Sequence, residues 1–319
     1  MTYQDVRALK GLPVLDESVA RHRQARRLRA RVKANLEGWA FISPTVLGLL
    51  IFTAFPMIAS LYFSLTDYDL LTSPRWIGLS NFGRMIHDRL FYTSLVNTAY
   101  YTFVGVPAQT LVALLEAMLL NMKVRGVNVF RTLYYLPTVT PTVATVILWV
   151  YILNRDYGLV NSALWLLGLP GIDWLYNPRV VKLSLILMSL WQVGGRMVVF
   201  LAALQGVPNE LYESASIDGA NALRRTWHIT LPMISSVMFF NLIIGIIGAW
   251  QVFTAAFIAT EGGPANATLF YVLYLYRHAF ENLRMGYASA LAWVLFIIVM
   301  IFTLLQFVFA RRWVYYEVS

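Results

Sequence analysis

The chain has 319 residues, of which 59% are hydrophobic and 13% charged, and its formal net charge is +9. Soluble domains carry about 25% charged residues, so this composition excludes an ordinary soluble protein and indicates a polytopic membrane protein. The absence of cysteine excludes disulfides and thiolate metal sites. We expect an all-α fold, because a helix satisfies its own backbone hydrogen bonds in lipid and an open strand does not.

The first 38 residues are strongly basic. Such a cluster, directly before an apolar run, favours a cytoplasmic flank facing anionic lipid over a nucleic-acid-binding arm, which is usually a block of like charge. The apolar run begins too late and is too long for a signal peptide. We predict a disordered basic tail over residues 1–38 and one membrane domain over residues 39–319. Nine of the 25 cations lie in this tail: Arg7, Lys10, Arg21, Arg23, Arg26, Arg27, Arg29, Arg31 and Lys33.

Six apolar stretches follow, each close to the roughly 20 residues that a membrane-spanning helix needs. The sequence therefore predicts six transmembrane helices. They cover Trp39–Leu65, Ser94–Leu120, Leu133–Leu153, Val180–Leu204, Met233–Thr260 and Ala288–Phe309. Four prolines within these spans or at their ends predict kinks or breaks: Pro56, Pro107, Pro137 and Pro141.

An even number of spans places both termini on one side of the membrane, and the basic tail places that side in the cytoplasm. Apart from the tail, the loops carry seven cations on this inner side and eight on the outer side, so the predicted orientation depends on the tail. The inner cations are Lys123, Arg125, Arg131, Arg224, Arg225, Arg311 and Arg312.

A polar segment of about residues 208–232 separates the fourth and fifth spans. Glu210 and Glu213 lie near the start of a short predicted helix, where the helix dipole favours negative charge. Asp218-Gly219 indicates its end, and a second short helix follows. The accompanying apolar residues either pack back onto the spans or insert into a groove of another chain, and the pattern favours neither. These residues are Leu211, Tyr212, Ile217, Leu223 and Trp227.

The sequence offers no catalytic chemistry. It contains no G-x-x-x-x-G-K-[ST] phosphate-binding loop and no Gly-Lys dipeptide, so the energy for any ATP-driven process must come from another chain. The four histidines (His22, His87, His228 and His278) are far apart in sequence and form no H-E-x-x-H motif, which favours surface or interface positions over metal binding. We predict no catalytic residue, no metal site and no cofactor in this chain.

Polar residues inside the spans are the candidates for a solute pathway, because such residues are costly in lipid and usually face a cavity or a partner helix. Gln192 and Arg196 are four residues apart and share one helix face, and the glycines between them allow close approach. A tryptophan beside amides suits carbohydrate, which stacks on the ring and hydrogen-bonds to the amides. Helix–helix hydrogen bonding is the alternative role. The candidates are Gln192, Arg196, Asn241, Trp250, Gln251 and Thr254.

Arg196 is the most specific of these candidates. An arginine deep in a span needs an anionic partner, and Glu116 is the only carboxylate within the predicted spans. Where neither Glu116 nor another subunit supplies that partner, an acidic solute is a suitable one for a guanidinium. The hypothesis is an acidic sugar, such as a uronate chain or a sugar phosphate.

The polar segment resembles the EAA loop of ABC importer permeases, E-A-A-x-x-D-G-A followed by I-x-L-P. Three further stretches are similar to permeases of the sugar type, the maltose and glycerol-phosphate type: "FRTLYYLPTVTPTVATVILWVYIL", "LAALQGVPNELYESA" and "ATEGGPANATLFYVLYLYRHAF". The four motifs occur in the expected order, and the resemblance they carry extends over nearly everything from about residue 39 to the end. Ser214 departs from the second alanine of the pattern. The matching residues are Glu213, Ser214, Ala215, Asp218, Gly219, Ala220, Leu231 and Pro232.

This resemblance implies a permease subunit in the bacterial cytoplasmic (inner) membrane that imports a carbohydrate, expected to be an oligosaccharide. Glu213 and its apolar neighbours would form a coupling helix docked on an ATPase subunit, where ATP and Mg are bound, and Gly219 would form the elbow. The expected partners are two ATPases, a second homologous permease and an extracytoplasmic solute-binding protein. The outer loop of Gly262, Gly263 and Pro264 would contact that binding protein.

A membrane-embedded enzyme and a stand-alone channel are the competing classes. An enzyme needs a cluster of titratable groups, which the sequence lacks, and a channel needs no polar segment suited to docking. The sequence does not identify the carbohydrate, and it does not distinguish a heterodimer of permeases from a homodimer.

Overall fold

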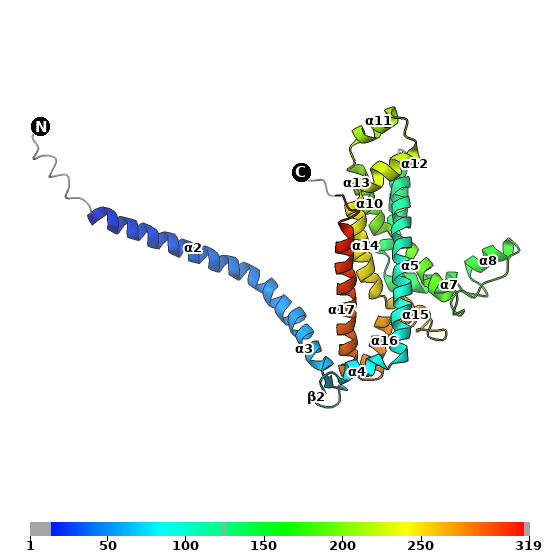
Figure 1. The fold of residues 1–319 in the computed structure, drawn as a ribbon, viewed down its shortest axis with the longest axis horizontal. Helices are drawn as coiled ribbons and strands as arrows, with labels where there is room; N and C mark the ends of the chain where they lie inside the picture. The colour runs from blue at the N-terminus through cyan, green and yellow to red at the C-terminus, as the bar shows by residue number, and fades with distance from the viewer. Residues whose placement is uncertain (1–13, 123–124, 316–319) are drawn as a thin grey trace, which may run out of the picture. The chain divides into compact units, whose positions relative to one another are not determined.

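Figure 1 shows the computed structural model, which describes residues 14–122 and 125–315. Most of it is helical, as the composition predicts. The chain divides into two compact units, Met1–Ser60 and Leu61–Ser319.

From Val14 onward the first unit is a continuous helical segment. The prediction of a disordered tail was wrong from Val14 onward. Residues 14–37 contain no glycine or proline and many strong helix formers, and they continue directly into the apolar span. The elements are α2 (Val14–Leu49), the π-helical turn η2 (Leu50–Ala54) and α3 (Phe55–Ser64), whose last four residues belong to the second unit. Arg7, Lys10 and Lys123 lie outside the described residues.

The second unit begins with a two-stranded hairpin, followed by a short helix and then the longest helix of the unit. Asp88 caps this long helix, because its carboxylate accepts hydrogen bonds from the amides of Leu90 and Phe91. Pro107 lies inside it without interrupting it. The elements are β1 (Thr66–Asp67), β2 (Arg75–Trp76), α4 (Ser80–Ile86) and α5 (Arg89–Leu120).

The next two spans are broken helices. The break predicted at Pro141 is confirmed: Thr140 is extended, because a residue before proline is pushed out of the helical region. Pro137 lies inside the preceding helix. The first pair, α6 (Val127–Val139) and α7 (Thr142–Ile152), bends by 101°, and the second pair, α9 (Val181–Leu190) and α10 (Gly194–Gln205), by 51°. The helix α8 (Leu159–Leu166) lies in the loop between the pairs.

The fifth span differs from the prediction of one helix to Thr260. Its helix ends at Trp250, and residues 251–253 are not helical, which is tolerated at membrane depth where backbone borders a cavity. The remaining elements are α11 (Asn209–Ile217), α12 (Ala222–Arg225), η3 (Thr226–Thr230), α13 (Leu231–Met233), α14 (Ser235–Trp250), α15 (Thr254–Ala259), α16 (Tyr271–Tyr276), η4 (Arg277–Glu281) and α17 (Met285–Ala310).

The number of spans agrees with the sequence. Within the described residues, three helices are long and apolar enough to cross a membrane, and three bent pairs bring the number of spans to as many as six. The straight helices are Lys33–Ser64, Arg89–Leu120 and Met285–Ala310. The pairs are α6 with α7, α9 with α10, and Ala222–Met233 with Ser235–Trp250.

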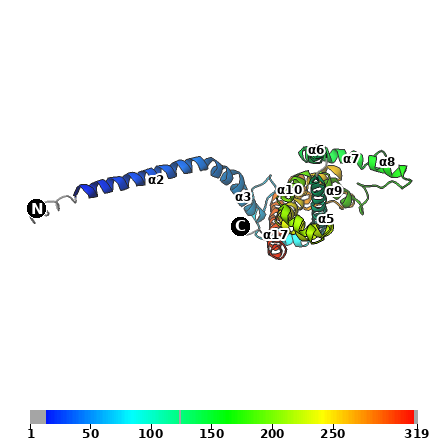
Figure 2. The same ribbon diagram turned by 90° about the horizontal axis from the view of Figure 1, so that it is seen from above.

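Helix α5 lies at the centre of the second unit and contacts α9, α10, α14 and α16 (Figures 1 and 2). In the most apolar 18-residue stretch of α5, 44% of the residues are buried, against 6% in that of α17. The other helices therefore pack around α5. The buried face of α5 carries small residues that let neighbouring backbones approach closely. They include Ser94, Thr98, Gly105, Ala113 and Ala117.

Candidate functional site

The polar segment of residues 208–232, here the coupling segment, folds as two short helices joined at a glycine elbow, as predicted. Helix α11 ends in a Schellman motif. Gly219 has φ +74°, its amide donates to the carbonyl of Ser216 at 3.1 Å, and the amide of Ala220 donates to Ala215 at 2.8 Å. Glycine adopts this left-handed conformation at the least steric cost, so the turn is sharp and its backbone groups are satisfied.

Helix α12 is fixed to the elbow from both sides. The side chain of Asn221 accepts a hydrogen bond from the amide of Arg224 at 2.9 Å, which caps the helix. Nη1 of Arg225 donates to the hydroxyl of Ser216 at 3.0 Å, back across the elbow to α11. The two helices therefore form one structural unit.

The apolar residues of the coupling segment divide into one that packs back on the spans and others that are exposed. Tyr212 packs against the buried cluster of α5, α10 and Ile234. Ile217, Leu223 and Trp227 instead expose 87%, 66% and 63% of their surface. Large apolar side chains that are exposed to solvent on a charged segment indicate an interaction surface.

Glu213 lies on the exposed side of α11 beside this apolar surface. It forms no ion pair with any residue that the structure describes. Ser214, which departs from the alanine of the EAA pattern, turns its hydroxyl to the carbonyl of Glu210 within the same helix. Leu231, near the end of the segment, packs with Tyr212 on the buried cluster, and Pro232 beside it is exposed. The exposed carboxylate and the apolar surface are thus presented together.

A cavity of about 250 Å³ lies at the breaks of the helices. Gln192 lines it, and its amide donates to Oγ1 of Thr145 at 3.1 Å and to the carbonyl of Pro137 at 3.3 Å. Gln251 and Thr254 line it from the turn after α14 and the start of α15. Polar groups and irregular backbone within the membrane spans are typical of a solute site. The polar lining consists of Tyr101, Thr142, Thr145, Ser189, Gln192, Gln251 and Thr254, with the indole of Trp149.

The two glycines after Gln192 bring α10 against α6, as the sequence predicts. The amide of Gly195 donates to the hydroxyl of Thr138 at 3.2 Å. A Cβ atom on Gly194 would collide with the carbonyl of Tyr134 and would lie 2.7 Å from Oγ1 of Thr138. Glycine is therefore required for this approach.

Arg196 lies one turn further along α10, outside the lining of this cavity. Its guanidinium packs beside α14, where a Cβ atom on Gly245 would lie 3.2 Å from Nη2. Its Nη1 is buried without a hydrogen bond, and within the described residues Arg196 forms no ion pair. Glu116 also keeps a buried carboxylate oxygen without a partner. The structure does not pair the two.

Two predicted pathway residues lie away from the cavity. Trp250 is 1% exposed, and its ring stacks on Phe302 with 5.5 Å between centroids. The amide of Asn241 donates to the carbonyl of Val237 in its own helix at 3.0 Å. In this conformation both residues lie among packed helices.

Sequence reasoning missed five residues of the polar lining: Tyr101, Thr142, Thr145, Trp149 and Ser189. Tyr101 lies in a span where aromatic residues are common, so its type alone carries no signal. Ser189 is three residues before Gln192, and this spacing on one helix was the available clue.

The turn of Gly262, Gly263 and Pro264 follows α15 and is held to α5. Gly262 has φ +79°, and the hydroxyl of Thr268 donates to the carbonyl of Gly263 at 2.7 Å. The amide of Asn97 in α5 donates to the carbonyl of Asn266 at 2.8 Å. The turn is thus an ordered surface, on the part of the bundle away from α11 (Figure 1).

The histidines form no catalytic or metal cluster in the described part of the chain. Nδ1 of His87 and Nδ1 of His228 each lie 3.0 Å from a backbone carbonyl four residues earlier. Across residues 14–122 and 125–315, no group of three or more histidine, aspartate and glutamate side chains could hold a metal ion.

Comparison with known proteins places the chain. Residues 105–315 match the family described as "Binding-protein-dependent transport system inner membrane component". Over 290 residues the chain is 45% identical to the probable ABC transporter permease protein YesP of Bacillus subtilis, covering 89% of this chain and 94% of the relative. Over 286 residues it is 35% identical to the lactose transport system permease protein LacF of Rhizobium radiobacter, covering 87% and 95%.

A solved structure shares the fold. The crystal structure of a bacterial ABC transporter involved in the import of the acidic polysaccharide alginate contains a chain that matches with a TM-score of 0.78 at 25% identity. The match covers 90% of this chain and 99% of that chain. The sequence and the fold agree over nearly the whole length, and the chain therefore belongs to the binding-protein-dependent transport system inner membrane components, which are permeases of ABC importers rather than enzymes.

Proposed function

We propose that this chain is one of two permease subunits in an ATP-driven importer that carries an oligosaccharide into the cytoplasm. The observation that carries the proposal is the exposed face of the coupling segment. Glu213 has no partner within the described residues there, and Ile217, Leu223 and Trp227 are exposed beside it. This is the chemistry of a helix that inserts into a groove of another protein.

An ATPase subunit is the proposed occupant of that face, because this chain has no phosphate-binding loop. Two ATPases, which bind ATP and Mg, would each dock on one permease. When the two ATPases close on each other, they would move α11, and α11 would in turn move the membrane spans. The second permease is proposed to be a homologue of this chain.

The orientation follows from the same proposal. If α11 meets a cytoplasmic ATPase, six spans place both termini in the cytoplasm, which agrees with the basic tail. The Gly262–Pro264 turn would then face outward and contact the extracytoplasmic binding protein. The ordered backbone of this turn suits a contact surface.

The proposed solute is an oligosaccharide bound at the cavity of Gln192, Gln251 and Thr254. The cavity has amide and hydroxyl groups next to the indole of Trp149, and such groups bind sugar hydroxyls and ring faces. The relatives support this solute class: LacF is a lactose permease, and AraP of Bacillus subtilis, 34% identical over 272 residues, is a permease for arabinooligosaccharides.

The environment of Arg196 supports the proposal that the oligosaccharide is acidic. Nη1 of Arg196 is buried without a partner, and the matching solved structure is a transporter for the acidic polysaccharide alginate. A carboxylate of the solute would supply the bidentate acceptor that a guanidinium prefers. The residue lies one helical turn after Gln192, in α10, which precedes α11 in the chain.

The first experiment is purification of this chain from its native membrane in mild detergent, with identification of every co-purifying protein. The expected result is an ATPase and a second permease. Glu213→Gln should reduce recovery of the ATPase, whereas Glu210→Gln on the same helix is the matched control. Recovery of the chain alone, under conditions that keep other importers intact, would contradict the proposal.

The second experiment measures ATPase activity of the reconstituted complex, including the binding protein, with neutral and acidic oligosaccharides of equal length. Acidic chains should stimulate hydrolysis in the natural protein, and Arg196→Gln should lower that stimulation by at least about tenfold, because a hydrogen bond to a charged group contributes about 1.5–3 kcal/mol. Arg179→Gln, an exposed arginine outside the cavity, is the control. Equal stimulation by acidic chains in Arg196→Gln would exclude the role of Arg196.

A further inference from the structure

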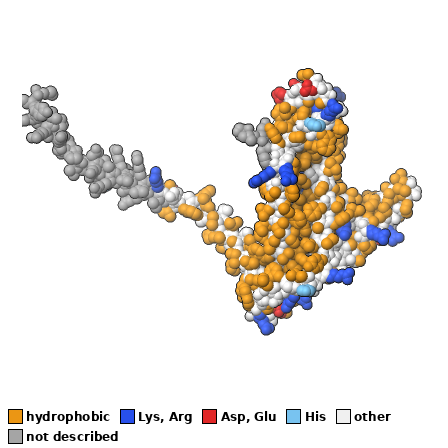
Figure 3. Space-filling model, in the orientation of Figure 1, with side chains coloured by type: hydrophobic (Ala, Val, Ile, Leu, Met, Phe, Trp, Pro, Cys, Tyr) orange, Lys and Arg blue, Asp and Glu red, His pale blue; other side chains and the backbone are white. Residues whose placement is uncertain are grey.

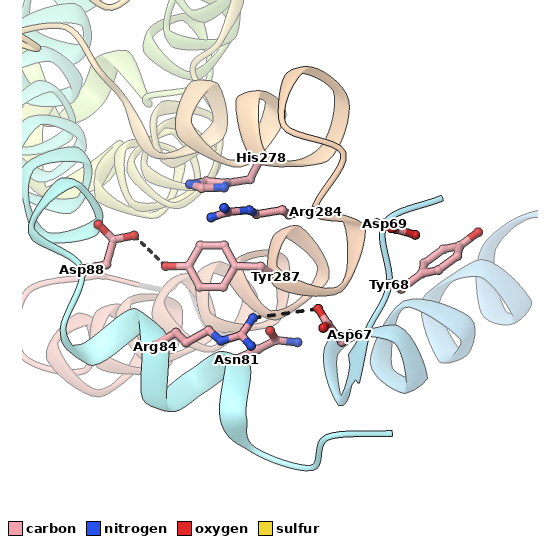
Figure 4. Close-up of a pocket in the computed structure, with 9 residues that line it drawn as sticks. All are labelled: Asp67, Tyr68, Asp69, Asn81, Arg84, Asp88, His278, Arg284 and Tyr287. Atoms are coloured by element: carbon pink, nitrogen blue, oxygen red, sulfur yellow. Dashed lines mark hydrogen bonds and ion pairs between the residues drawn. The ribbon is translucent and has the colours of Figure 1, made fainter. Parts of the chain in front are cut away.

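A larger cavity lies at the end of the bundle opposite α11, and its volume is about 590 Å³. Six of its lining residues come from one loop, residues 65–88 between α3 and α5, and the others come from η4 and the start of α17. Figure 4 shows all nine: Asp67, Tyr68, Asp69, Asn81, Arg84, Asp88, His278, Arg284 and Tyr287. Neither the solute pathway nor the coupling segment uses them.

The back of this cavity is a rigid hydrogen-bonded wall. The buried amide of Asn81 donates to the carbonyls of Ser64 and Thr66, both at 2.9 Å. One oxygen of Asp88 caps α5, and the other accepts the hydroxyls of Tyr274 and Tyr287. The loop, α5, α16 and α17 are thus tied together, so the cavity is preformed.

Among the residues that the structure describes, one buried atom on this wall lacks a hydrogen-bond partner, and one exposed cation beside it is unpaired. His278 is 9% exposed, and its buried Nδ1 has no hydrogen-bond partner. The guanidinium of Arg284 forms no ion pair with any described residue. Figure 4 shows both side chains extending from the η4–α17 segment toward Asp88, into the cavity. A buried polar atom without a protein partner calls for a ligand or an ordered water to satisfy it.

The charges around the cavity are mixed. The lining carries three carboxylates, Asp67, Asp69 and Asp88, and Arg84 and Arg284 supply two cations. The only ion pair among them, Arg84 to Asp67, is long at 3.9 Å and more than half exposed, so it is weak. A simple anion would meet the carboxylates and a simple cation the guanidiniums. A ligand that carries both charges would satisfy both.

The loop that builds the cavity also exposes large apolar side chains. A loop in bulk water rarely exposes so many within about twenty residues, whereas a loop at the membrane–water boundary does. Figure 3 shows charged side chains and a histidine gathered at this end, next to a broad hydrophobic surface. The exposed residues are Leu70, Leu71, Trp76, Leu79 and Ile86, at 42%, 79%, 63%, 71% and 63%.

We propose that this cavity binds the headgroup of a zwitterionic phospholipid with a primary ammonium, a phosphoethanolamine lipid. The phosphate lies against Arg84, Arg284 and the imidazole of His278, and the ammonium donates to Asp67 and Asp69. The acyl chains lie along the apolar side chains of the same loop. A free sugar would not use that apolar rim, which is why the lipid is the ligand that the observations favour.

The test is native mass spectrometry of the full-length purified chain, titrated separately with phosphatidylethanolamine, phosphatidylcholine and phosphatidylglycerol of identical acyl chains. Phosphatidylethanolamine should bind about fivefold more tightly than phosphatidylcholine, whose quaternary ammonium cannot donate a hydrogen bond to Asp67 or Asp69. It should also bind more tightly than phosphatidylglycerol, which lacks the ammonium.

Two variants separate the two halves of the site. Arg84→Gln with Arg284→Gln should weaken binding of all three lipids, and Asp69→Asn should weaken only phosphatidylethanolamine. Arg179→Gln, also on a loop but outside the cavity, should change nothing. Thermal unfolding of each variant confirms folding, and Asp69→Asn remains informative if the double variant is unstable, because Asp69 is on the surface.

Equal binding of the three lipids would overturn the proposal, as would unchanged selectivity in Asp69→Asn. Displacement of bound lipid by oligosaccharide would also overturn it and would assign the cavity to a solute. None of these results depends on the transport proposal, because the assay contains neither ATPase nor binding protein.

Discussion

The hydroxyl of Tyr212 in α11 lies 3.0 Å from the hydroxyl of Thr230 in η3, and this contact joins α11 to the helical turns that lead into α14. Tyr212 packs on the buried cluster, and Thr230 is 6% exposed. A force applied to the exposed face of α11 therefore reaches α13 and α14 through packed side chains as well as through the backbone.

This contact predicts non-additive mutations. Tyr212→Phe and Thr230→Val should each destabilise the protein by about 1 kcal/mol, the usual net contribution of one hydrogen bond. The double variant should cost little more than either single one, because both remove the same interaction. Thermal unfolding of the purified full-length chain measures all three. Fully additive losses would show that the two hydroxyls are not coupled.

The elbow at Gly219 predicts a backbone effect. Its φ is +74°, and a Cβ atom there would meet no other atom within 4 Å. Gly219→Ala should therefore cost about 1 kcal/mol from conformation alone, while Gly219→Asn should cost less, because asparagine tolerates this conformation. The readout is ATP-driven uptake together with thermal unfolding. Equal behaviour of the alanine and asparagine variants would contradict this explanation.

The contact between α10 and α14 predicts a steric effect at Gly245. A Cβ atom there would lie 2.8 Å from Cγ1 of Val106 and 3.2 Å from the guanidinium of Arg196. Gly245→Ala should cost about 1–3 kcal/mol through overpacking. Gly248→Ala, one turn further along the same helix where nothing lies within 4 Å, should be neutral. Unfolding temperatures that do not separate these two variants would argue against close packing at Gly245.

The hydrogen-bonded wall of the cavity of about 590 Å³, where Asp88 accepts from Tyr274 and Tyr287, predicts that the stability of the protein depends on pH. Burial alone would raise the pKa of Asp88, but the hydrogen bonds from Tyr274 and Tyr287 outweigh it and lower the pKa below its ordinary value of 3.8. Because the folded pKa is lowered, the stabilisation from ionised Asp88 is complete above the unfolded pKa of about 3.9. It is lost as the pH falls through the folded pKa.

Asp88→Asn should therefore be less stable than the natural protein at neutral pH by about 1–2 kcal/mol. The difference should shrink only below about pH 4. Thermal unfolding between neutral and acidic pH measures it, with Asp156→Asn in an exposed outer loop as control. A difference that does not depend on pH would show that the charge of Asp88 is not involved.

Much of the molecule could be predicted because it depends on local rules. Twenty apolar residues need a helix in lipid, proline at 141 breaks one, and Asp218-Gly219 ends another. The exposed position of Glu213 follows from the same local reasoning. Two predictions were wrong. The tail is helical from Val14, because its residues are strong helix formers that continue into the first span. The helix of the fifth span ends at Trp250, where the backbone borders a cavity, and does not continue to Thr260.

The sequence by itself determined the class of protein, the six spans and the coupling segment, since each depends on residues close together in the chain. Only the tertiary structure decided which polar residues share a cavity. Gln192 and Gln251 meet there while Trp250 stacks on Phe302, because the bends between broken helices set which faces converge. It also decided that Asp88, Tyr274 and Tyr287, about two hundred residues apart, hold one hydrogen-bonded wall, because packing around α5 brings distant segments together.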